Sequence, residues 1–409
     1  MSDFVLRNGI IVSGAEKPHK SSLGVQGRYL AGSGAAAMDL KGASCVYPGL
    51  INTHDHLQGN YRPAVGPKPG QFYLTWLPWD NDLKASDTFR ERSQLTRDDL
   101  YALSGYKCLF SGVTTVNDHF PQKFNSGILP ALPIRAILEY GLAHEASSYD
   151  LKWGDGLEIE HERAKKNKWP FITHLAEGFD EEAMNGVNYL ESLKLLDRHC
   201  LLIHCIGLSD SDIKKIAAAG ASVSWCGFSN MFMFNVTCKV RKLMQAGVNM
   251  TIGTDSSATG TANLLAEIKY DRELYRGLYG EDLPAKAIFN MITDNAAKAF
   301  WMDHKIGTLE AGKFADILVV RRKNDDPYEN LVNAAMEDIE LLVLEGMPIY
   351  GELRFLDACG GELPADYTQI TVGKRPMFVK GDPAGLYREC RKKIGFRKEL
   401  DYLPFEPGE

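Results

Sequence analysis

Apolar residues are spaced in two different ways along this chain. Near both ends, short apolar runs are punctuated by glycine, as in "DFVLRNGIIVSG" and "IELLVLEGMPIYG", which indicates the strands of a small sheet. Asn8-Gly9 lies between two β-prone runs and predicts a hairpin. In the middle of the chain, apolar strands alternate with amphipathic helices, which predicts an α/β protein with a parallel sheet, most simply a (β/α)₈ TIM-type barrel.

Several elements of this central region carry local signals of their own. A strand is expected from Val46 to Thr53, before the histidine pair of "YPGLINTHDHLQ". The capping box Thr96-x-x-Asp99 predicts the start of a helix. Ser209 predicts the start of a later helix, which Gly220 is expected to end.

The pattern divides the chain into three parts. Residues 1–46 and 306–352 are expected to form one small β-sandwich domain from both chain ends, because neither segment buries much surface alone. Residues 47–305 are expected to form the barrel, and residues 353–409 a C-terminal extension.

Possible metal ligands fall where apolar strands end. "FITH" ends at His174, "LLIH" ends at His204, and "TIGTD" ends at Asp255. His54 and His56 stand two apart, so they point the same way if their segment is a strand. A single such histidine is more often a core residue, but the carboxyl ends of parallel barrel strands meet on one face. Imidazoles and a carboxylate gathered there suit zinc or a similar divalent ion.

Composition narrows the class of protein. The chain has 409 residues, a formal net charge of −7 and 24% charged residues, which argues against a nucleic-acid-binding surface. No apolar run has membrane length and the N-terminus lacks a signal-peptide pattern, so no membrane partner is expected. The 8 cysteines include no C-x-x-C pair. We therefore expect a cytoplasmic protein with reduced thiols.

The motifs together resemble those of the amidohydrolase superfamily. They are "PGLINTHDH", "GVTTV.D", "HLAE", "GTDSS" and "TDNAAKAF…IGTLEAGKFADILVV". Within the superfamily the chain is most similar to the cytosine deaminase-like group, which contains adenosylhomocysteine/methylthioadenosine deaminases, guanine deaminases and triazine hydrolases. The resemblance covers residues 3 to 350 and is far more specific for the superfamily than for a substrate.

The resemblance implies roles for individual residues. One divalent metal ion is expected, with zinc favoured and iron as an alternative, and its implied ligands are His54, His56, His174 and Asp255. Glu177 matches the proton shuttle of the family. His204 matches a histidine that contacts the attacking water or the substrate, and Asp255 is expected to orient that water.

Two departures from the family pattern bear on the site. Binuclear relatives bridge two metals with a carboxylated lysine that closes a strand, and none of the lysines in residues 134–170 does so, which favours one metal. Relatives also carry an extra strand–helix unit before the "HLAE" strand. Residues 145–168 have room for one helix and little else, so one βα unit is expected to be irregular or shortened. His144, Glu145 and His161 receive no role.

The implied chemistry is hydrolytic. The leading hypothesis is a metal-dependent aminohydrolase that deaminates a small nitrogen heterocycle, with Gln58, Arg62 and Trp76 as candidate substrate contacts in the loop after the first barrel strand. The alternative is hydrolysis of a cyclic amide, an N-alkyl substituent or a halide. A hypothesis of another class is a non-catalytic barrel used for binding or assembly. A homo-oligomer is plausible by analogy alone.

Overall fold

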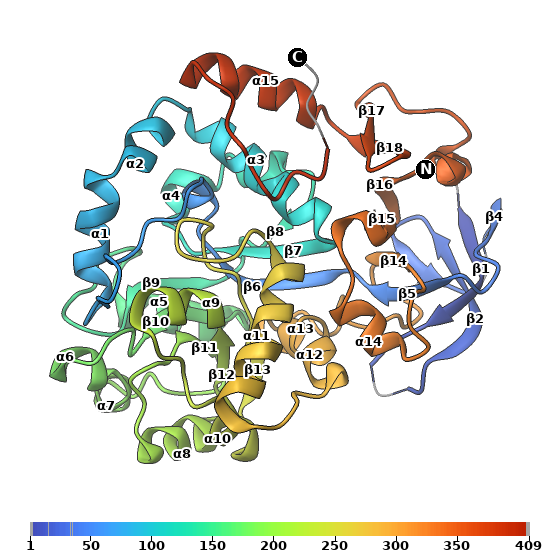
Figure 1. Ribbon diagram of the computed structural model, residues 1–409. Coiled ribbons are helices and arrows are strands. Elements are labelled where there is room, and N and C mark those ends of the chain that lie inside the picture. Colours follow the sequence, from blue (N-terminus) through green and yellow to red (C-terminus); the bar gives the residue numbers. More distant parts are fainter. Residues whose placement is uncertain (1–2, 15, 33, 35, 406–409) are drawn as a thin grey trace.

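The computed structural model describes residues 3–14, 16–32, 34 and 36–405. Residues 406–409 of the expected C-terminal extension, and residues 1–2 of the expected N-terminal part, lie outside these ranges. No helix among the described residues is both long enough and apolar enough to cross a membrane. Figure 1 shows the chain with the mixed sheet on one side and the parallel strands and most helices on the other.

The central region holds two parallel sheets. One has three strands in the order β6-β7-β8, and the other has five in the order β13-β12-β11-β10-β9. Their bounds are β6 (Leu50–Asp55), β7 (Val113–Asp118), β8 (Arg135–Ala136), β9 (Gly141–Glu145), β10 (Phe171–Leu175), β11 (Cys200–His204), β12 (Ser222–Trp225) and β13 (Asn249–Ile252). The α/β class and the parallel pairing expected from the sequence are thus present.

Backbone hydrogen bonds join the two sheets at both of their edges. The amide of Asp255, just after β13, donates to the carbonyl of His54 in β6 at 3.1 Å. At the other edge only residues 137–140 separate β8 from β9. Ile137 N donates to Val116 O of β7, whereas Gly141 N donates to Pro170 O beside β10. Within segment 135–145, β8 therefore pairs with β7 and β9 pairs with β10, with only four residues between the two strands.

Residues 145–168, where the sequence predicts the irregular or shortened unit, hold one helix as expected, and the connection without a helix lies earlier, at residues 137–140. No helix separates β8 from β9, and α5 (Leu157–Asn167) is the one helix between β9 and β10 in this fully described stretch. Helices follow or precede the other strands: α1 (Trp76–Ala85), α2 (Asp87–Arg92), α3 (Arg97–Phe110), α4 (Gln122–Asn125), α6 (Glu181–Met184), α7 (Gly186–Ser192), α8 (Asp210–Ala219), α9 (Gly227–Phe234), α10 (Val240–Gln245), α11 (Leu264–Tyr279), α12 (Ala285–Met291) and α13 (Asp294–Ala299).

Both capping predictions are confirmed. α3 begins after Thr96, whose side chain accepts a hydrogen bond from Asp99 N while Asp99 accepts one from Thr96 N. α8 begins after Ser209 in the same reciprocal arrangement and ends at Gly220, which has a left-handed backbone. Such caps satisfy backbone groups that a helix end leaves unpaired.

The strand expected over Val46–Thr53 is wrong as a single element. The chain forms β5 (Ser44–Pro48) and then β6, separated at Gly49. A Cβ on Gly49 would lie 2.3 Å from the Thr114 side chain, so only glycine allows this close turn. β5 belongs to the mixed sheet and β6 to the parallel strands, and Gly49 therefore marks the passage between the two.

The mixed sheet has ten strands drawn from both chain ends. Its other members are β1 (Phe4–Ile11), β2 (His19–Gln26), β3 (Tyr29–Ala31), β4 (Ala36–Asp39), β14 (Ile317–Arg321), β15 (Ile339–Leu344), β16 (Met347–Glu352), β17 (Tyr367–Val372) and β18 (Arg375–Lys380). The hairpin expected at Asn8-Gly9 is wrong: β1 continues through both residues and its register against β2 shifts there. Asn8 has a positive φ of 59° and donates a side-chain hydrogen bond to Asp39, which stabilises this irregularity.

The C-terminal segment is integrated into both parts of the molecule. β18 pairs with β16, which adds β17 and β18 to the mixed sheet. α15 (Pro383–Ile394) then packs Tyr387 and Cys390 against Leu100 and Leu103 of α3, and Figure 1 shows these two helices side by side. The remaining elements are α14 (Pro327–Val332) and four 3₁₀ turns, Leu57–Gly59, Leu129–Ala131, Met336–Asp338 and Leu353–Cys359.

Candidate metal centre and active site

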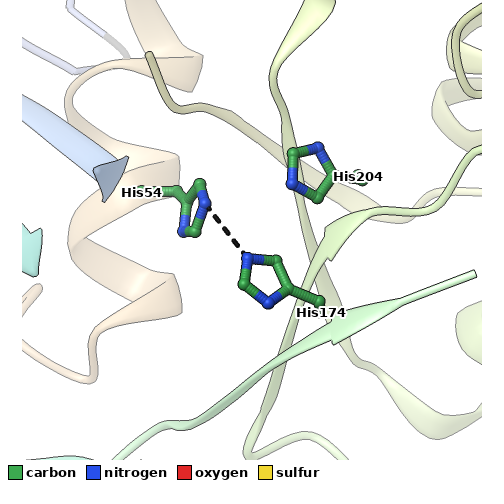
Figure 2. A group of neighbouring side chains, drawn as sticks. All are labelled: His54, His174 and His204. Carbon is green, nitrogen blue, oxygen red and sulfur yellow. Dashed lines mark hydrogen bonds between the residues drawn. The ribbon is translucent and has the colours of Figure 1, made fainter. Parts of the chain in front are cut away.

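Histidines from three parallel strands converge at the carboxyl ends of those strands. His54 lies in β6, His174 in β10 and His204 at the end of β11, and all three side chains are buried. Figure 2 shows the three imidazoles facing a common space. His56 follows β6 and Asp255 follows β13, so both reach the same space from neighbouring strand ends.

The ligand atoms form two overlapping groups that share His54. Nitrogens of His54, His174 and His204 lie within 4.8 Å of one another, and so do ligand atoms of His54, His56 and Asp255. His54 Nε2 lies 3.4 Å from His174 Nε2 and 3.9 Å from Asp255 Oδ1. The structure thus brings together every metal ligand expected from the sequence, with His204 beside them.

Hydrogen bonds orient two of the rings for coordination. His174 Nδ1 lies 2.6 Å from the carbonyl oxygen of His144, which can only accept, so this nitrogen carries the proton. His204 Nδ1 lies 2.9 Å from Asn230 Oδ1 in the same way. Each ring therefore presents an unprotonated Nε2 to the shared space, which is the usual arrangement of a metal-binding histidine.

The contact between His54 and His174 indicates a cation. His54 Nδ1 is buried and has no hydrogen-bond partner among the described residues. If His54 Nδ1 carries the proton, two Nε2 lone pairs face each other at 3.4 Å; if Nε2 carries it, a lone pair is buried without a donor. A divalent ion between the rings removes the first conflict, so this donor set fits a metal ion.

Burial keeps these imidazoles neutral. Burial first, and then the charges of neighbouring imidazoles, hold the pKa of His54 and of His174 well below the ordinary value. Burial also lowers the pKa of His204, which Asp255 and Asn230 partly offset. Neutral imidazole is the form that binds metals.

The two carboxyl groups of the site have opposite environments. Burial raises the pKa of Asp255, but His56, His204 and donors to its oxygens outweigh this and hold the pKa below its usual value. Those donors are Ser229 Oγ at 2.7 Å and Ser256 N at 2.6 Å.

Glu177 is buried with fewer compensating donors. Its burial, followed by the negative charge of Asp255, raises the pKa of Glu177 well above the ordinary value. Glu177 Oε1 lies 3.6 Å from His204 Nε2. One carboxylate is therefore held ionised and the other is able to hold a proton, which is the separation needed for acid–base work.

A cavity of about 290 Å³ opens over this cluster. Of the candidate substrate contacts, Gln58 and Trp76 line the cavity. Trp76 is fixed by a 2.7 Å hydrogen bond from its Nε1 to Glu145 Oε2. Further lining residues are His56, Trp79, Phe89, Arg92, Phe120, His144, Trp153, His174, Glu177, His204 and Asp255.

Arg62 is placed differently from the other candidates. Its Nε donates to Asp401 at 3.2 Å and its Nη1 donates to the Ser257 carbonyl at 3.2 Å. Arg62 does not line the cavity. It ties the C-terminal segment to the loop after β13, and its expected contact with substrate stays a sequence-based prediction.

Sequence reasoning missed a buried ion pair beneath the site. Lys107 of α3 is 1% exposed, and its Nζ lies 2.8 Å from Asp55 Oδ2 and 2.7 Å from Asn60 Oδ1. The same ammonium donates to the backbone oxygen of Asp255 at 3.3 Å. Asp55 lies between the two histidines of the H-x-H pair, so this ion pair holds the strand ends that carry three of the candidate ligands. The apolar neighbours of Lys107 in "YKCLF" were the available signal.

Comparison with known proteins finds a family model and relatives of similar sequence. The amidohydrolase family model matches residues 161–346. A 5-methylthioadenosine/S-adenosylhomocysteine deaminase of Moorella thermoacetica is 27% identical, over 88% of this chain and 94% of the relative. A 5′-deoxyadenosine deaminase of Methanocaldococcus jannaschii is 26% identical, over 74% of this chain and 86% of the relative. The chain is thus similar to the amidohydrolase family over residues 161–346 and to deaminases of that kind over most of its length.

Solved structures share the fold. The atrazine chlorohydrolase of Arthrobacter aurescens TC1 in complex with zinc superimposes with a TM-score of 0.68 at 18% identity, covering 85% of this chain and 95% of that one. An adenosine deaminase of Xanthomonas campestris with bound zinc gives a TM-score of 0.68 at 16% identity, covering 96% and 98%. At these identities the likeness concerns the fold alone.

Proposed function

We propose that this protein is a metal-dependent aminohydrolase that removes an amino group from a small nitrogen heterocycle. The observation that carries the proposal is the gathering of His54, His56, His174 and Asp255 around one space, with Glu177 and His204 facing each other in the same cavity. The deaminase activity named for the relatives supports this reaction rather than another hydrolysis.

One divalent ion, zinc by preference, would be held by His54, His56, His174 and Asp255. Such an ion supplies Lewis acidity that makes a water molecule nucleophilic near neutral pH. A single ion is proposed because the buried Lys107 lies in α3 and is already paired with Asp55, so it is not placed to bridge two metals.

Glu177 is the proposed proton carrier. Its carboxylate would accept a proton from the attacking water and deliver it to a ring nitrogen or to the departing amine. The raised pKa of Glu177 suits this exchange, because a carboxyl group of ordinary pKa is a poor acid near neutral pH. His204, fixed by Asn230, would direct its Nε2 at the oxygen that develops at the attacked carbon.

The cavity wall suits a flat ring. Trp153 approaches the rings of His56 and His144 with centroid distances of 6.1 and 4.5 Å, and Trp76 lines the same space. Aromatic side chains of this kind stack on or edge against planar heterocycles. Gln58 adds an amide that can donate to or accept from such a ring.

Ammonia release is the direct test of this proposal. The metal-loaded protein is assayed against panels of purines, pyrimidines, pterins and amino-triazines, and we expect ammonia from at least one panel. Activity confined to lactams or to halogenated or N-alkylated rings would replace the deaminase by the alternative hydrolase. Less than one bound ion per chain in protein purified without chelator, together with no turnover, would favour the non-catalytic binding protein.

Features of the whole chain, namely its fold, domain limits and location, are proposed together with the function. We propose that the two parallel sheets form one TIM-type barrel with a shortened unit at segment 135–145, and that the ten-stranded sheet folds as a sandwich beside it. The domain limits 1–46 with 306–352, 47–305 and 353–409 stay a prediction, and the strands β17 and β18 argue for moving part of the extension into the small domain. A cytoplasmic location is proposed from the cysteines: the seven that can be described are all free and buried.

A homo-oligomer is proposed by analogy with related enzymes alone.

A further inference from the structure

An arginine lines the candidate active-site cavity with neither an acidic nor a hydrogen-bonding partner for its side chain among the described residues. Arg92 is the last residue of α2 and is half-buried in the cavity wall. Its guanidinium carbon lies 5.0 Å from the ring centre of Phe89. Within the described part of the chain, no carboxylate forms an ion pair with this guanidinium and no acceptor takes a hydrogen bond from it. Its five N–H donors are therefore available to a molecule bound in the cavity.

Comparable arginines of this protein are paired. Arg135 contacts Asp316 and Glu345, and Arg272 contacts Asp282 and Glu329. Those carboxylates raise the pKa of Arg135 and of Arg272, whereas burial alone lowers the pKa of Arg92. An arginine stays protonated in proteins, so the charge of Arg92 persists although its surroundings disfavour it.

The acids of the cavity do not neutralise Arg92. Asp80 is paired with Lys84, Glu177 faces His204, and Asp255 accepts from Ser229, Thr259 and Ser256. The acid adjacent in sequence, Glu91, is paired with Lys398. The positive charge of Arg92 is therefore not paired with any carboxylate that lines the cavity.

Arg92 stands at the boundary between the main cavity and a neighbouring recess. Gln58, Phe89 and Arg92 line both, and the recess is further lined by Ser93, Leu95, Arg97 and Leu100. Gln58 comes four residues after His54, so this boundary lies beside the H-x-H pair. A substituent directed from a ring at the metal cluster past Gln58 would reach Arg92.

We propose that the substrate is a nitrogen heterocycle carrying an anionic group, a carboxylate or a phosphate, which pairs with Arg92. The planar guanidinium matches the two oxygens of either anion. This inference rests on the proposed function only for the position of the ring, because the pairing itself is a binding event that does not require turnover.

Direct binding separates this proposal from the proposed reaction. Zinc-loaded protein carrying Glu177→Gln, which suppresses turnover, is titrated calorimetrically with two matched pairs: nicotinate against nicotinamide, and adenosine 5′-monophosphate against adenosine. We expect the anionic member of at least one pair to bind roughly 10- to 100-fold more tightly, as expected for hydrogen bonds to a charged group. The carboxylate pair and the phosphate pair identify which anion the site accepts.

Arg92 variants assign the preference to this residue. Arg92→Met should abolish the preference for the anionic member, and Arg92→Lys should keep part of it. Arg90→Met is the matched control, because Arg90 lies on the same helix, is exposed, and is already paired with Asp87 outside the cavity. Circular dichroism and thermal unfolding establish that each variant is folded.

The results have distinct meanings. No anionic preference in the parent protein, or a preference that survives Arg92→Met, overturns the proposal. An Arg92-dependent preference without ammonia release from any amino-heterocycle keeps the anion site and overturns the proposed deamination. Ammonia release from neutral rings only, with no effect of Arg92→Met on their binding, keeps the deamination and overturns the anion site.

Discussion

Glu177 is the residue whose chemistry can be tested most directly. Glu177→Gln keeps the shape of the side chain but removes its ability to carry a proton. We expect kcat to fall by roughly 10²- to 10⁴-fold, the usual contribution of general acid–base catalysis. Metal content, measured by atomic absorption, should be unchanged because Glu177 is not among the grouped ligands. Equal loss of metal and activity would instead make Glu177 a ligand.

Lys107 shows what a residue-by-residue reading of the sequence misses. The candidate ligands were predictable because each one ends an apolar strand, and strand ends of a parallel sheet share one face. Lys107 lies within a helix, where a lysine is normally solvated. Only the packing of α3 against the end of β6 places the Lys107 ammonium beside Asp55. Contacts between residues 52 positions apart are not encoded in a local pattern.

Removing one member of this buried pair should be costly. Lys107→Met leaves Asp55 as an uncompensated buried charge, and we expect the free energy of unfolding to fall by about 3–5 kcal/mol. Urea unfolding followed by circular dichroism measures this loss. The double variant Lys107→Met/Asp55→Asn should recover part of the stability, because the remaining polar groups are neutral. A double variant less stable than Lys107→Met would contradict this account.

At the scale of elements, α11 carries two buried carboxyl groups behind the site. Glu267 accepts hydrogen bonds from Phe228 N and Thr261 Oγ1, and Asp271 lies one turn further along. Burial raises the pKa of Glu267 to about 7, and burial followed by the charge of Glu267 raises the pKa of Asp271 well above its usual value. A Cβ on Gly227 at the start of α9 would lie 1.9 Å from Asp271 Oδ1, so α9 packs directly on this pair.

These carboxyl groups should make stability depend on pH. In the unfolded chain they release their protons near pH 4. In the folded chain the pKa of Glu267 is raised to about 7 and the pKa of Asp271 is raised well above its usual value, so both keep their protons to higher pH. The folded state therefore binds more protons over this interval, and the free energy of unfolding should fall as the pH rises from 5 to 8. Asp271→Asn should reduce this fall, measured by urea unfolding at both pH values.

A matched acid provides the control for that measurement. Glu273 lies on the same helix, is exposed and is paired with Arg276. Glu273→Gln should leave the pH dependence as it is in the parent protein, since an exposed ion pair contributes little to stability. An identical pH dependence in the parent and in Asp271→Asn would show that Asp271 ionises normally in the folded chain.

Elements with a local signal were predictable, and those defined by distant contacts were not. The capping boxes of α3 and α8 were readable because their hydrogen bonds span three residues. Asn8-Gly9 has the composition of a hairpin turn, yet β1 pairs with β2 before and after it, with only a shift in register between Leu6 and Gly9. Likewise the apolar run around Gly49 reads as one strand, although Thr114 of β7 and the mixed sheet divide it.

At the scale of the whole molecule, the proposed metal centre draws on segments that are far apart in the chain. His54 and His174 lie in β6 and β10 and Asp255 follows β13, so an ion bound by these residues would link both parallel sheets. An ion that binds the folded chain alone stabilises it by RT ln(1 + [L]/Kd), about 4 kcal/mol when the ion is present at 1,000 times its Kd. In the unfolded chain these side chains are far apart and bind the ion weakly. The binding free energy of the ion should therefore add to the stability of the whole folded chain.

Removing the ion should therefore lower the thermal stability of the intact chain. Dialysis against a chelator should reduce Tm by several degrees, and adding zinc should restore it. Asp255→Asn, which weakens the carboxylate ligand but keeps its volume, should show a smaller response to zinc. Calorimetry with metal analysis of the same samples measures both quantities. An unchanged Tm in protein shown to be free of metal would mean that these side chains do not form a metal centre that stabilises the fold. That result would contradict the proposed metal-dependent hydrolysis.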